Sequence, residues 1–241
     1  MARIASFHLV REPGLKAPLA LARLGTDRPR LARVPGLRFW RLLGTGGGSD
    51  TGPGADLART ALFAVWDDVA DLDRFVVDHP IAHRWDRATE SWHVRLRLLG
   101  GHGRWRGLDP LDGLEPGDRA ARDRPVAALT RADVRRQAGR SFRRAAREVD
   151  TELHTADGLI DVVGIGEAPI GRLATFSLWS SLEAARAFAY SMPRHQRVID
   201  ETRNGDWYSE EMFARFQPYA SRGTWNGRDP LATEPTERAP S

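Results

Sequence analysis

Short apolar runs and alternating apolar and polar positions recur in eight segments, each of a length typical of a strand. These segments are residues 3–10, 36–44, 60–66, 92–99, 125–131, 158–166, 173–179 and 208–216. Between them, apolar positions spaced three or four apart predict helices, for instance after Asp68 and over residues 134–149. Strands and helices therefore alternate along most of the chain.

Local signals mark several helix starts. Asp67 and Asp68 are N-cap residues for one helix, and Ser180 with Glu183 forms a capping box before another. Shorter helical pieces are predicted after Pro80 and over residues 193–202.

Residues 45–54 (TGGGSDTGPG) form a glycine-rich loop by composition. Glycines of this kind can cradle a phosphate group. The segment lacks the strand-to-helix spacing and the Lys-Ser/Thr pair of a P-loop, so we predict a linker or a lid.

The second half of the chain repeats the first. Phe63, Trp66, Phe75 and Pro80 recur as Phe176, Trp179, Phe188 and Pro193, at a constant offset of 113 residues. Trp105, Gly107, Asp109, Pro110 and Leu111 recur as Trp225, Gly227, Asp229, Pro230 and Leu231, at an offset of 120. His83 corresponds to His195 after a one-residue gap. These matches predict a tandem duplication, and two copies are too few for a solenoid.

Each half has the order strand–helix–strand–strand–helix–strand, which is the ferredoxin-like βαββαβ unit. One such sheet leaves a bare face that must be covered. We therefore predict an α+β protein in which two repeats form an intrachain, pseudo-dimeric α/β barrel with a ligand cavity between sheets and helices. The predicted parts are an N-terminal repeat (1–116), a linker (117–124), a C-terminal repeat (125–231) and a flexible tail (232–241).

Composition narrows the class of protein. The 241 residues are 41% hydrophobic and 28% charged, as in a folded globular protein. The absence of cysteine excludes disulfides and thiolate metal sites. We expect a cytoplasmic protein, because there is no signal-peptide pattern and no apolar run of the roughly 18–20 residues of a membrane span. The net charge is +4, and no nucleic-acid recognition motif accompanies it, so we expect no nucleic-acid partner.

His195 is the first candidate for chemistry, in the sequence MPRHQ. A single histidine is more often a surface or capping residue, but the matching His83 and the aromatic anchors nearby favour a function. His79 and His83 are four residues apart, a spacing that suits two zinc ligands on one helical face. Pro80 between them argues against one continuous helix, so zinc is the weaker interpretation.

Arg131, Arg135 and Arg172 fall at predicted ends of strands or helices. They are either solvated there or donate to the carboxylates of a bound cofactor, which the guanidinium fork fits. Trp207 and Phe216 belong either to the core or to a pocket wall. Nucleophilic chemistry is not indicated, since a Gly-x-Ser-x-Gly elbow is absent.

Several motifs together resemble the spheroidene monooxygenase family of carotenoid ketolases. They are Ala128-Leu129-Thr130-Arg131-Ala132, Gly166-Glu167-Ala168-Pro169, Arg172-x-Ala174-Thr175-Phe176-Ser177-x-Trp179, His195-Gln196 and Ser209-Glu210-x-Met212-Phe213-x-Arg215-Phe216. The resemblance covers about residues 126–218 and is most specific between residues 166 and 179. The first half resembles the family weakly and has the character of a diverged repeat.

The resemblance implies a dimeric α/β-barrel fold, shared with chlorite dismutases, dye-decolourising peroxidases and aldoxime dehydratases. It also implies a haem-dependent oxygenase that uses haem b and oxidises a carotenoid carbon near the end of the polyene. His195 inherits the role of axial ligand to the iron. Arg131 and Arg172 are the expected partners of the haem propionates, and Phe176 and Trp207 complete the expected cofactor-binding set.

Three functions remain open at this point. The first is a haem-dependent monooxygenase acting on a small apolar substrate, such as a carotenoid or another secondary metabolite. The second is a haem enzyme of another class, such as a dehydratase, a peroxidase or an enzyme of nitrogen-centred chemistry. The third is a non-catalytic haem-binding or cofactor-free barrel. An extended apolar substrate implies at most peripheral membrane contact, and both a monomer and a homo-oligomer fit the pattern.

Overall fold

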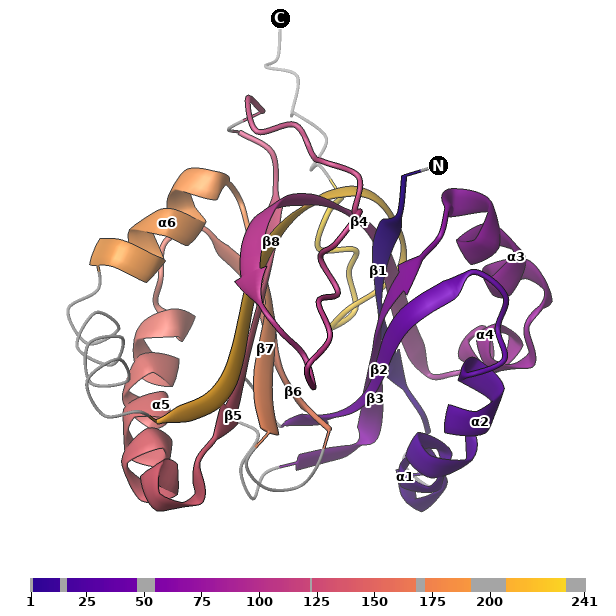
Figure 1. Cartoon of the computed structure of the whole chain (residues 1–241), viewed down its shortest axis with the longest axis horizontal. Helices are drawn as coiled ribbons and strands as arrows, with labels where there is room; N and C mark the ends of the chain where they lie inside the picture. The colour runs from indigo at the N-terminus through magenta and orange to yellow at the C-terminus, as the bar shows by residue number, and fades with distance from the viewer. Residues whose placement is uncertain are drawn as a thin grey trace, which may run out of the picture.

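The computed structural model describes residues 2–13, 17–46, 55–121, 123–167, 172–191 and 207–232. Its strands close into one antiparallel barrel in the order β1-β3-β2-β6-β7-β5-β8-β4 (Figure 1). They are β1 (Ile4–Arg11), β2 (Leu37–Gly46), β3 (Ala55–Trp66), β4 (Glu90–Gly103), β5 (Val126–Val134), β6 (Leu159–Gly166), β7 (Arg172–Trp179) and β8 (Tyr208–Gly223).

Helices cover the outside of the barrel on two opposite sides (Figure 1). Beside the N-terminal strands lie α1 (Ala17–Thr26), α2 (Arg28–Leu31), α3 (Val69–Asp78) and α4 (Pro80–Trp85), and beside the C-terminal strands lie the short helix η2 (Arg136–Ala138), α5 (Gly139–His154) and α6 (Leu182–Ser191). The halves join along β4–β8 and β2–β6. The α+β class and the duplicated intrachain barrel are thereby confirmed.

The interior of the barrel is a packed core. Phe7 from the first half stacks on Phe176 from the second, with ring centroids 3.9 Å apart. Trp92, Trp105 and Trp225 are also fully buried among apolar side chains of both halves. Large apolar side chains on the inner faces of both sheets are thus removed from water by closure, which is the main driving force for the barrel.

The layer between helices and strands shows the same repeat. Trp66 packs on Phe75 under α3, with ring centroids 5.1 Å apart, and Trp179 packs on Phe188 under α6 at 5.2 Å. These are the pairs that the offset of 113 residues relates. The repeated aromatic residues are therefore helix-to-sheet anchors in each half.

The segments after β4 and β8 form matching turns. Trp105 N–H donates to the Leu108 carbonyl at 2.8 Å, and Trp225 N–H donates to the Arg228 carbonyl at 2.7 Å. The residue after each tryptophan has a positive φ, 54° at Arg106 and 55° at Asn226. The second offset of 120 residues therefore also marks a true structural repeat.

Each turn is held by a glutamate from the other half. Glu210 at the start of β8 accepts a hydrogen bond from Gly107 N–H at 2.6 Å. Glu90 at the start of β4 accepts one from Gly227 N–H at 2.7 Å. The turns therefore tie the halves together reciprocally.

Some predicted boundaries shift. Val134 still pairs with Tyr208 in the sheet, so the helix expected over residues 134–149 begins at Gly139 instead. The strand expected at 60–66 starts at Ala55, because its first residues pair with the end of β2. The glycine-rich segment contributes its first two residues to β2, and residues 47–54 lie outside the described part, as does the helical piece expected at 193–202.

The capping box predicted at Ser180 is wrong by one residue. Ser181 Oγ accepts a hydrogen bond from Ala184 N–H at 3.0 Å, which is the contact that an N-cap makes with the third helical residue. Ser180 instead uses its backbone N–H to bond the Gly158 carbonyl at 2.7 Å. A tight turn at Gly158, with φ of 79°, thus displaces the cap.

Replacing Ser181 with alanine is expected to lower the free energy of unfolding by about 1 kcal/mol, because one orphan N–H at the start of α6 loses its acceptor. The matched variant Ser180→Ala removes a hydroxyl of the same size and leaves the backbone bond intact, so it should change stability by less than about 0.5 kcal/mol. Urea denaturation followed by circular dichroism compares the two. Equal losses would show that Ser181 is not the cap.

Candidate functional site

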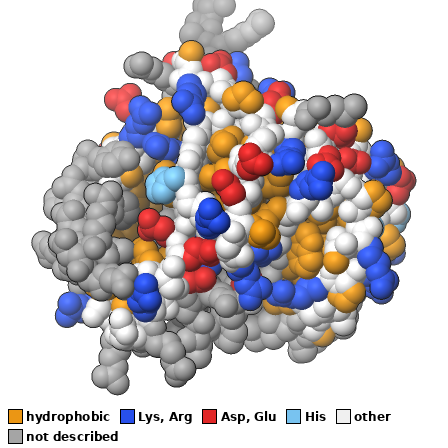
Figure 2. All heavy atoms as spheres, in the orientation of Figure 1, with side chains coloured by type: hydrophobic (Ala, Val, Ile, Leu, Met, Phe, Trp, Pro, Cys, Tyr) orange, Lys and Arg blue, Asp and Glu red, His pale blue; other side chains and the backbone are white. Residues whose placement is uncertain are grey.

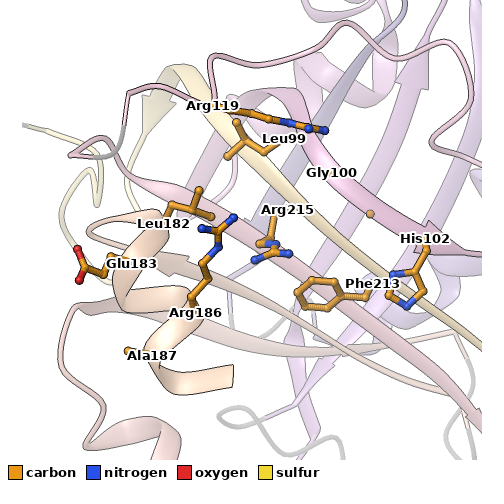
Figure 3. A pocket seen from close by; sticks show the side chains of 11 residues that line it. Leu99, Gly100, His102, Arg119, Leu182, Glu183, Arg186, Ala187, Phe213 and Arg215 are labelled. Carbon is orange, nitrogen blue, oxygen red and sulfur yellow. The ribbon is translucent and has the colours of Figure 1, made fainter. Parts of the chain in front are cut away.

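A groove of about 910 Å³ lies on the outer side of the C-terminal half, between α6, the end of β4 and the middle of β8 (Figure 3). Its lining residues come from four places in the chain. Strand β4 contributes Leu99, Gly100, Gly101 and His102, and the segment between β4 and β5 contributes Arg119. Helix α6 contributes Leu182, Glu183, Arg186 and Ala187, and β8 contributes Phe213 and Arg215.

The groove combines an apolar wall with cationic groups. Leu99, Leu182 and Phe213 provide apolar surface, and the His102 ring lies 6.2 Å from that of Phe213, centroid to centroid. The Arg215 guanidinium lies over the Phe213 ring, 5.2 Å from its centroid. Such a lining suits a largely apolar ligand that also carries negative groups.

A register shift between Leu98 and Gly100 shapes the β4 side of the groove. Gly100 has a φ of 156°, a backbone conformation that residues with a side chain rarely adopt. At Gly101 a β-carbon would lie 2.6 Å from the Phe213 carbonyl oxygen, so a larger residue would not fit there. The bulge re-aims the end of β4 so that His102 reaches the groove.

The corresponding region of the N-terminal half is closed by aromatic rings. The Trp85 ring lies 4.8 Å from the ring of His8 and 5.3 Å from that of His93, stacked on both. His8 Nδ1 hydrogen-bonds His93 Nδ1 at 3.0 Å, and His8 Nε2 bonds Ser6 Oγ at 2.9 Å. These residues fill the space between the sheet and α4.

Burial makes both of these imidazoles neutral. It lowers the pKa of His8 well below its ordinary value, helped by the neighbouring His93 and Arg95. Burial likewise lowers the pKa of His93 to about 4, with Arg222 acting in the same direction and Asp86 against it. A single Nδ1–H is shared between the two rings, which requires at least one neutral imidazole.

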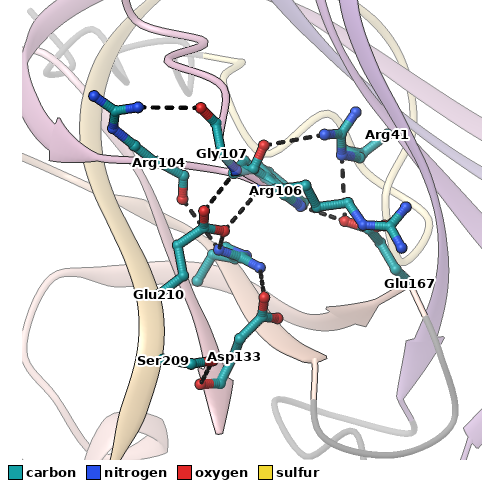
Figure 4. A network of polar contacts seen from close by, with 10 residues as sticks. Arg41, Arg104, Arg106, Gly107, Asp133, Glu167, Ser209 and Glu210 are labelled. Atoms are coloured by element: carbon teal, nitrogen blue, oxygen red, sulfur yellow. Dashed lines mark hydrogen bonds and ion pairs between the residues drawn. The ribbon is translucent and has the colours of Figure 1, made fainter.

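A polar network joins the two halves near the Trp105 turn (Figure 4). Glu167 is almost fully buried and pairs with Arg41 and Arg106, each at 3.3 Å. Trp105 Nε1 also donates to Glu167. Burial lowers the pKa of Arg41, and Glu167 opposes that shift. The network is therefore a structural link between β2 and the C-terminal half.

Arg131 belongs to the same network. It is 3% exposed, pairs with Asp133 and Glu210, and donates to the Arg104 carbonyl at 3.0 Å. Burial opposes ionisation of Glu210, but hydrogen bonds from Gly107, Arg106 and Arg131 outweigh it and lower the pKa of that carboxyl. Arg131 thus makes its contacts within this polar network, and it is not among the residues that line the groove.

The other predicted cofactor-binding residues are placed as follows. Phe176 faces the barrel interior, opposite to the groove. Trp207 is 9% exposed and packs with Ala138 beside the start of α5. His195 and the side chain of Arg172 lie outside the described part of the chain.

The structure adds three residues that the sequence analysis did not select, namely His102, Arg186 and Arg215. All three line the groove. Arg215 falls in a motif of the family resemblance, and the offsets of the internal repeat relate Arg186 to Asp73 and Arg215 to Arg95. These two equivalences are the features of the sequence from which the two arginines could have been found.

His79 and His83 have capping roles. His79 Nδ1 accepts a hydrogen bond from Ile81 N–H at 3.2 Å, and a ring nitrogen of His83 bonds the Val77 carbonyl at 2.6 Å. Within the described residues, no group of three or more His, Cys, Asp and Glu side chains could hold a metal ion. None of the helices in that part of the chain has the length and apolarity to cross a bilayer.

Charges on the surface are mixed. Figure 2 shows basic and acidic side chains interspersed with hydrophobic ones over the face that it presents. This agrees with the interleaving of basic and acidic residues along the sequence.

Comparison with known proteins gives consistent relatives. The chain is 30% identical to the spheroidene monooxygenase of Rhodobacter capsulatus over 237 residues, covering 98% of each chain. It is 40% identical to that of Rubrivivax gelatinosus over 197 residues, covering 80% of this chain and 73% of the relative. No family model matches.

Solved structures show the same fold. An aldoxime dehydratase superposes with a TM-score of 0.60 at 11% identity, covering 90% of this chain and 81% of the other. The aldoxime dehydratase OxdRE in complex with butyraldoxime also gives 0.60, at 13% identity, covering 90% and 79%. At such identities the likeness concerns the fold alone.

The neutral His8–His93 pair predicts a dependence of stability on pH. Below about pH 6.5 both histidines bind protons in the unfolded chain, whereas in the folded protein the pKa of His93 is lowered to about 4 and that of His8 lies well below its ordinary value. The free energy of unfolding should therefore be highest above pH 6.5 and fall on acidification toward pH 4, by up to about 1.4 kcal/mol per pH unit for each proton.

Urea denaturation at pH 7, 6, 5 and 4.5 measures this profile. His93→Gln removes one titrating ring and should flatten it. The matched variant His154→Gln changes a half-exposed histidine at the end of α5 and should leave the profile unchanged. An equally steep profile in His93→Gln would rule out the pair as its source.

Proposed function

The chain belongs to the spheroidene monooxygenase family, and on this premise we propose that it is a haem-dependent monooxygenase that oxidises a carotenoid or a similarly extended apolar molecule. Membership makes the protein an oxidoreductase. The substrate is inferred from the names of the relatives, and the haem from the groove described above.

The observation that carries the haem proposal is the lining of the groove. Haem is a flat, mostly apolar ring with two carboxylates and an iron that takes an imidazole ligand. The groove offers about 910 Å³, an apolar wall that includes Leu182 and Phe213, guanidinium groups and one imidazole. The residues present therefore fit this cofactor in volume, polarity and charge.

His195 remains our proposed axial ligand. It follows Ser191, the last residue of α6, by four positions in the sequence, and α6 forms one wall of the groove. His102 lines the groove from β4 and is the alternative imidazole. A ligating histidine also needs an acceptor for its second ring nitrogen.

Bound haem would supply the activation of dioxygen, and the protein would supply orientation and exclusion of water. Leu99, Leu182 and Phe213 would hold the ring and keep water from its face. If His195 holds the iron, the His102 imidazole would remain as a polar group in the groove. We further infer a cytoplasmic enzyme that reaches its apolar substrate through peripheral contact with a membrane surface.

The ligand assignment is tested by absorption spectra of the purified protein with added haem, oxidised and then reduced under carbon monoxide. Wild type is expected to give a Soret band that shifts as histidine-ligated haem does. His195→Ala should lose that band or change it to that of a weaker ligand, because the iron loses its imidazole.

The matched control is His154→Ala, since His154 lies at the end of α5 and pairs with Asp150. It should leave the spectrum unchanged. A normal spectrum in His195→Ala combined with loss in His102→Ala would transfer the ligand to His102. Absence of any Soret band in wild type would refute haem dependence.

A further inference from the structure

Strand registers relate the two halves residue by residue. Phe7 pairs with Phe63 and Val94 in the first half, as Leu129 pairs with Phe176 and Ala214 in the second. Since Phe63 and Phe176 are equivalent, Val94 is equivalent to Ala214, and the next residue, Arg95, is equivalent to Arg215. The offset of 113 residues that relates α3 to α6 makes Asp73 equivalent to Arg186.

In the N-terminal half these positions form an ion pair. Arg95 on β4 donates to Asp73 on α3, which ties the helix to the sheet. His8, fully buried and stacked on Trp85, completes the closure. These contacts pack the described residues of the helices against the sheet in this half.

In the C-terminal half the acid of this pair is replaced by a second arginine. Arg186 on α6 and Arg215 on β8 both line the groove, and Figure 3 shows both side chains extending into it. Among the residues that the structure describes, neither has a carboxylate partner. Glu183, the acidic residue of the lining, points away from both (Figure 3).

The other closing residues are changed as well. The register makes Thr130 equivalent to His8, and Thr130 is exposed where His8 is buried. Residues 192–206, which follow α6 as α4 follows α3, contain no Phe, Trp or Tyr to match Trp85. Among the residues that the structure describes, this region is filled by aromatic rings in one half and forms a groove lined by Arg186 and Arg215 in the other.

We propose that Arg186 and Arg215 form a carboxylate clamp that binds the two propionates of haem. The proposal rests on the proposed function and adds to it the anion-binding residues, in place of Arg131. Two guanidinium groups that line one groove without a carboxylate partner can each take a carboxylate of the ligand through charge-assisted, bidentate hydrogen bonds. The clamp would set the orientation of the ring in the groove.

The test compares haem with haem dimethyl ester, whose carboxylates carry no charge. Full-length protein stripped of haem is titrated with each compound, and binding is followed by the Soret band. Wild type is expected to bind haem roughly ten-fold or more tightly than the ester, as for hydrogen bonds to charged groups. Arg186→Asp should lose this preference while its affinity for the ester stays within about three-fold of wild type.

Arg186→Asp also recreates the pair seen between Arg95 and Asp73, so the haem-free variant should melt at a temperature no lower than wild type. Arg215→Gln tests the clamp without introducing a carboxylate, and it too should reduce the preference for haem over the ester. The control Arg87→Asp makes the same charge change on an exposed residue after α4 and should keep the full preference for haem.

Equal affinity of wild type for haem and ester would overturn the clamp and leave haem binding intact. Preference for haem retained in both Arg186→Asp and Arg215→Gln would overturn it too. No Soret band with either compound in wild type would instead refute the proposed function, and the clamp with it.

Discussion

The mutual burial of two sheet faces is the constraint on which the rest of this structure depends. Each half supplies four strands whose inner face carries large apolar side chains, and one half alone would leave them in water. Closure stacks Phe7 of one half on Phe176 of the other and buries Trp105 and Trp225 completely. Since the interior is filled by side chains, the groove for a ligand lies outside the barrel, beside α6.

The order of strands and the duplication could be predicted because their signals are local or large. Trp66 with Phe75, and Trp179 with Phe188, are helix-to-sheet contacts whose size leaves a recognisable mark in both halves. Alternation and helical spacing located all eight strands, although β3 begins five residues before its predicted start and β8 ends seven residues after its predicted end. Errors arose where pairing with a distant strand decided the boundary, as at Val134, which pairs with Tyr208.

Which face of the sheet a given strand residue points to could not be predicted from the sequence. Thr130 is exposed on the outer side, whereas Arg131, one position later, is buried in the network with Glu210. A shift of one residue reverses the face, and the sequence does not show the register. Arg186 and Arg215 could not be predicted as site residues for a related reason. Their correspondence to Asp73 and Arg95 is in the sequence, but its meaning depends on knowing that the helix and the strand face one another.

Duplication lets stability and binding reside in different halves of one molecule. Trp85, the neutral histidine pair and the Arg95–Asp73 ion pair add packing and a helix-to-sheet link in the N-terminal half. In the C-terminal half the equivalent positions do not form these contacts, and a groove lined by Arg186 and Arg215 lies there. Among the described residues these two arginines form no ion pair, so they add no such link between α6 and the sheet. Here the reciprocal turns held by Glu90 and Glu210 couple the C-terminal half to the N-terminal half of the same chain. Exchanging one acid for an arginine on α6 can therefore turn a structural ion pair into a binding site without loss of the fold.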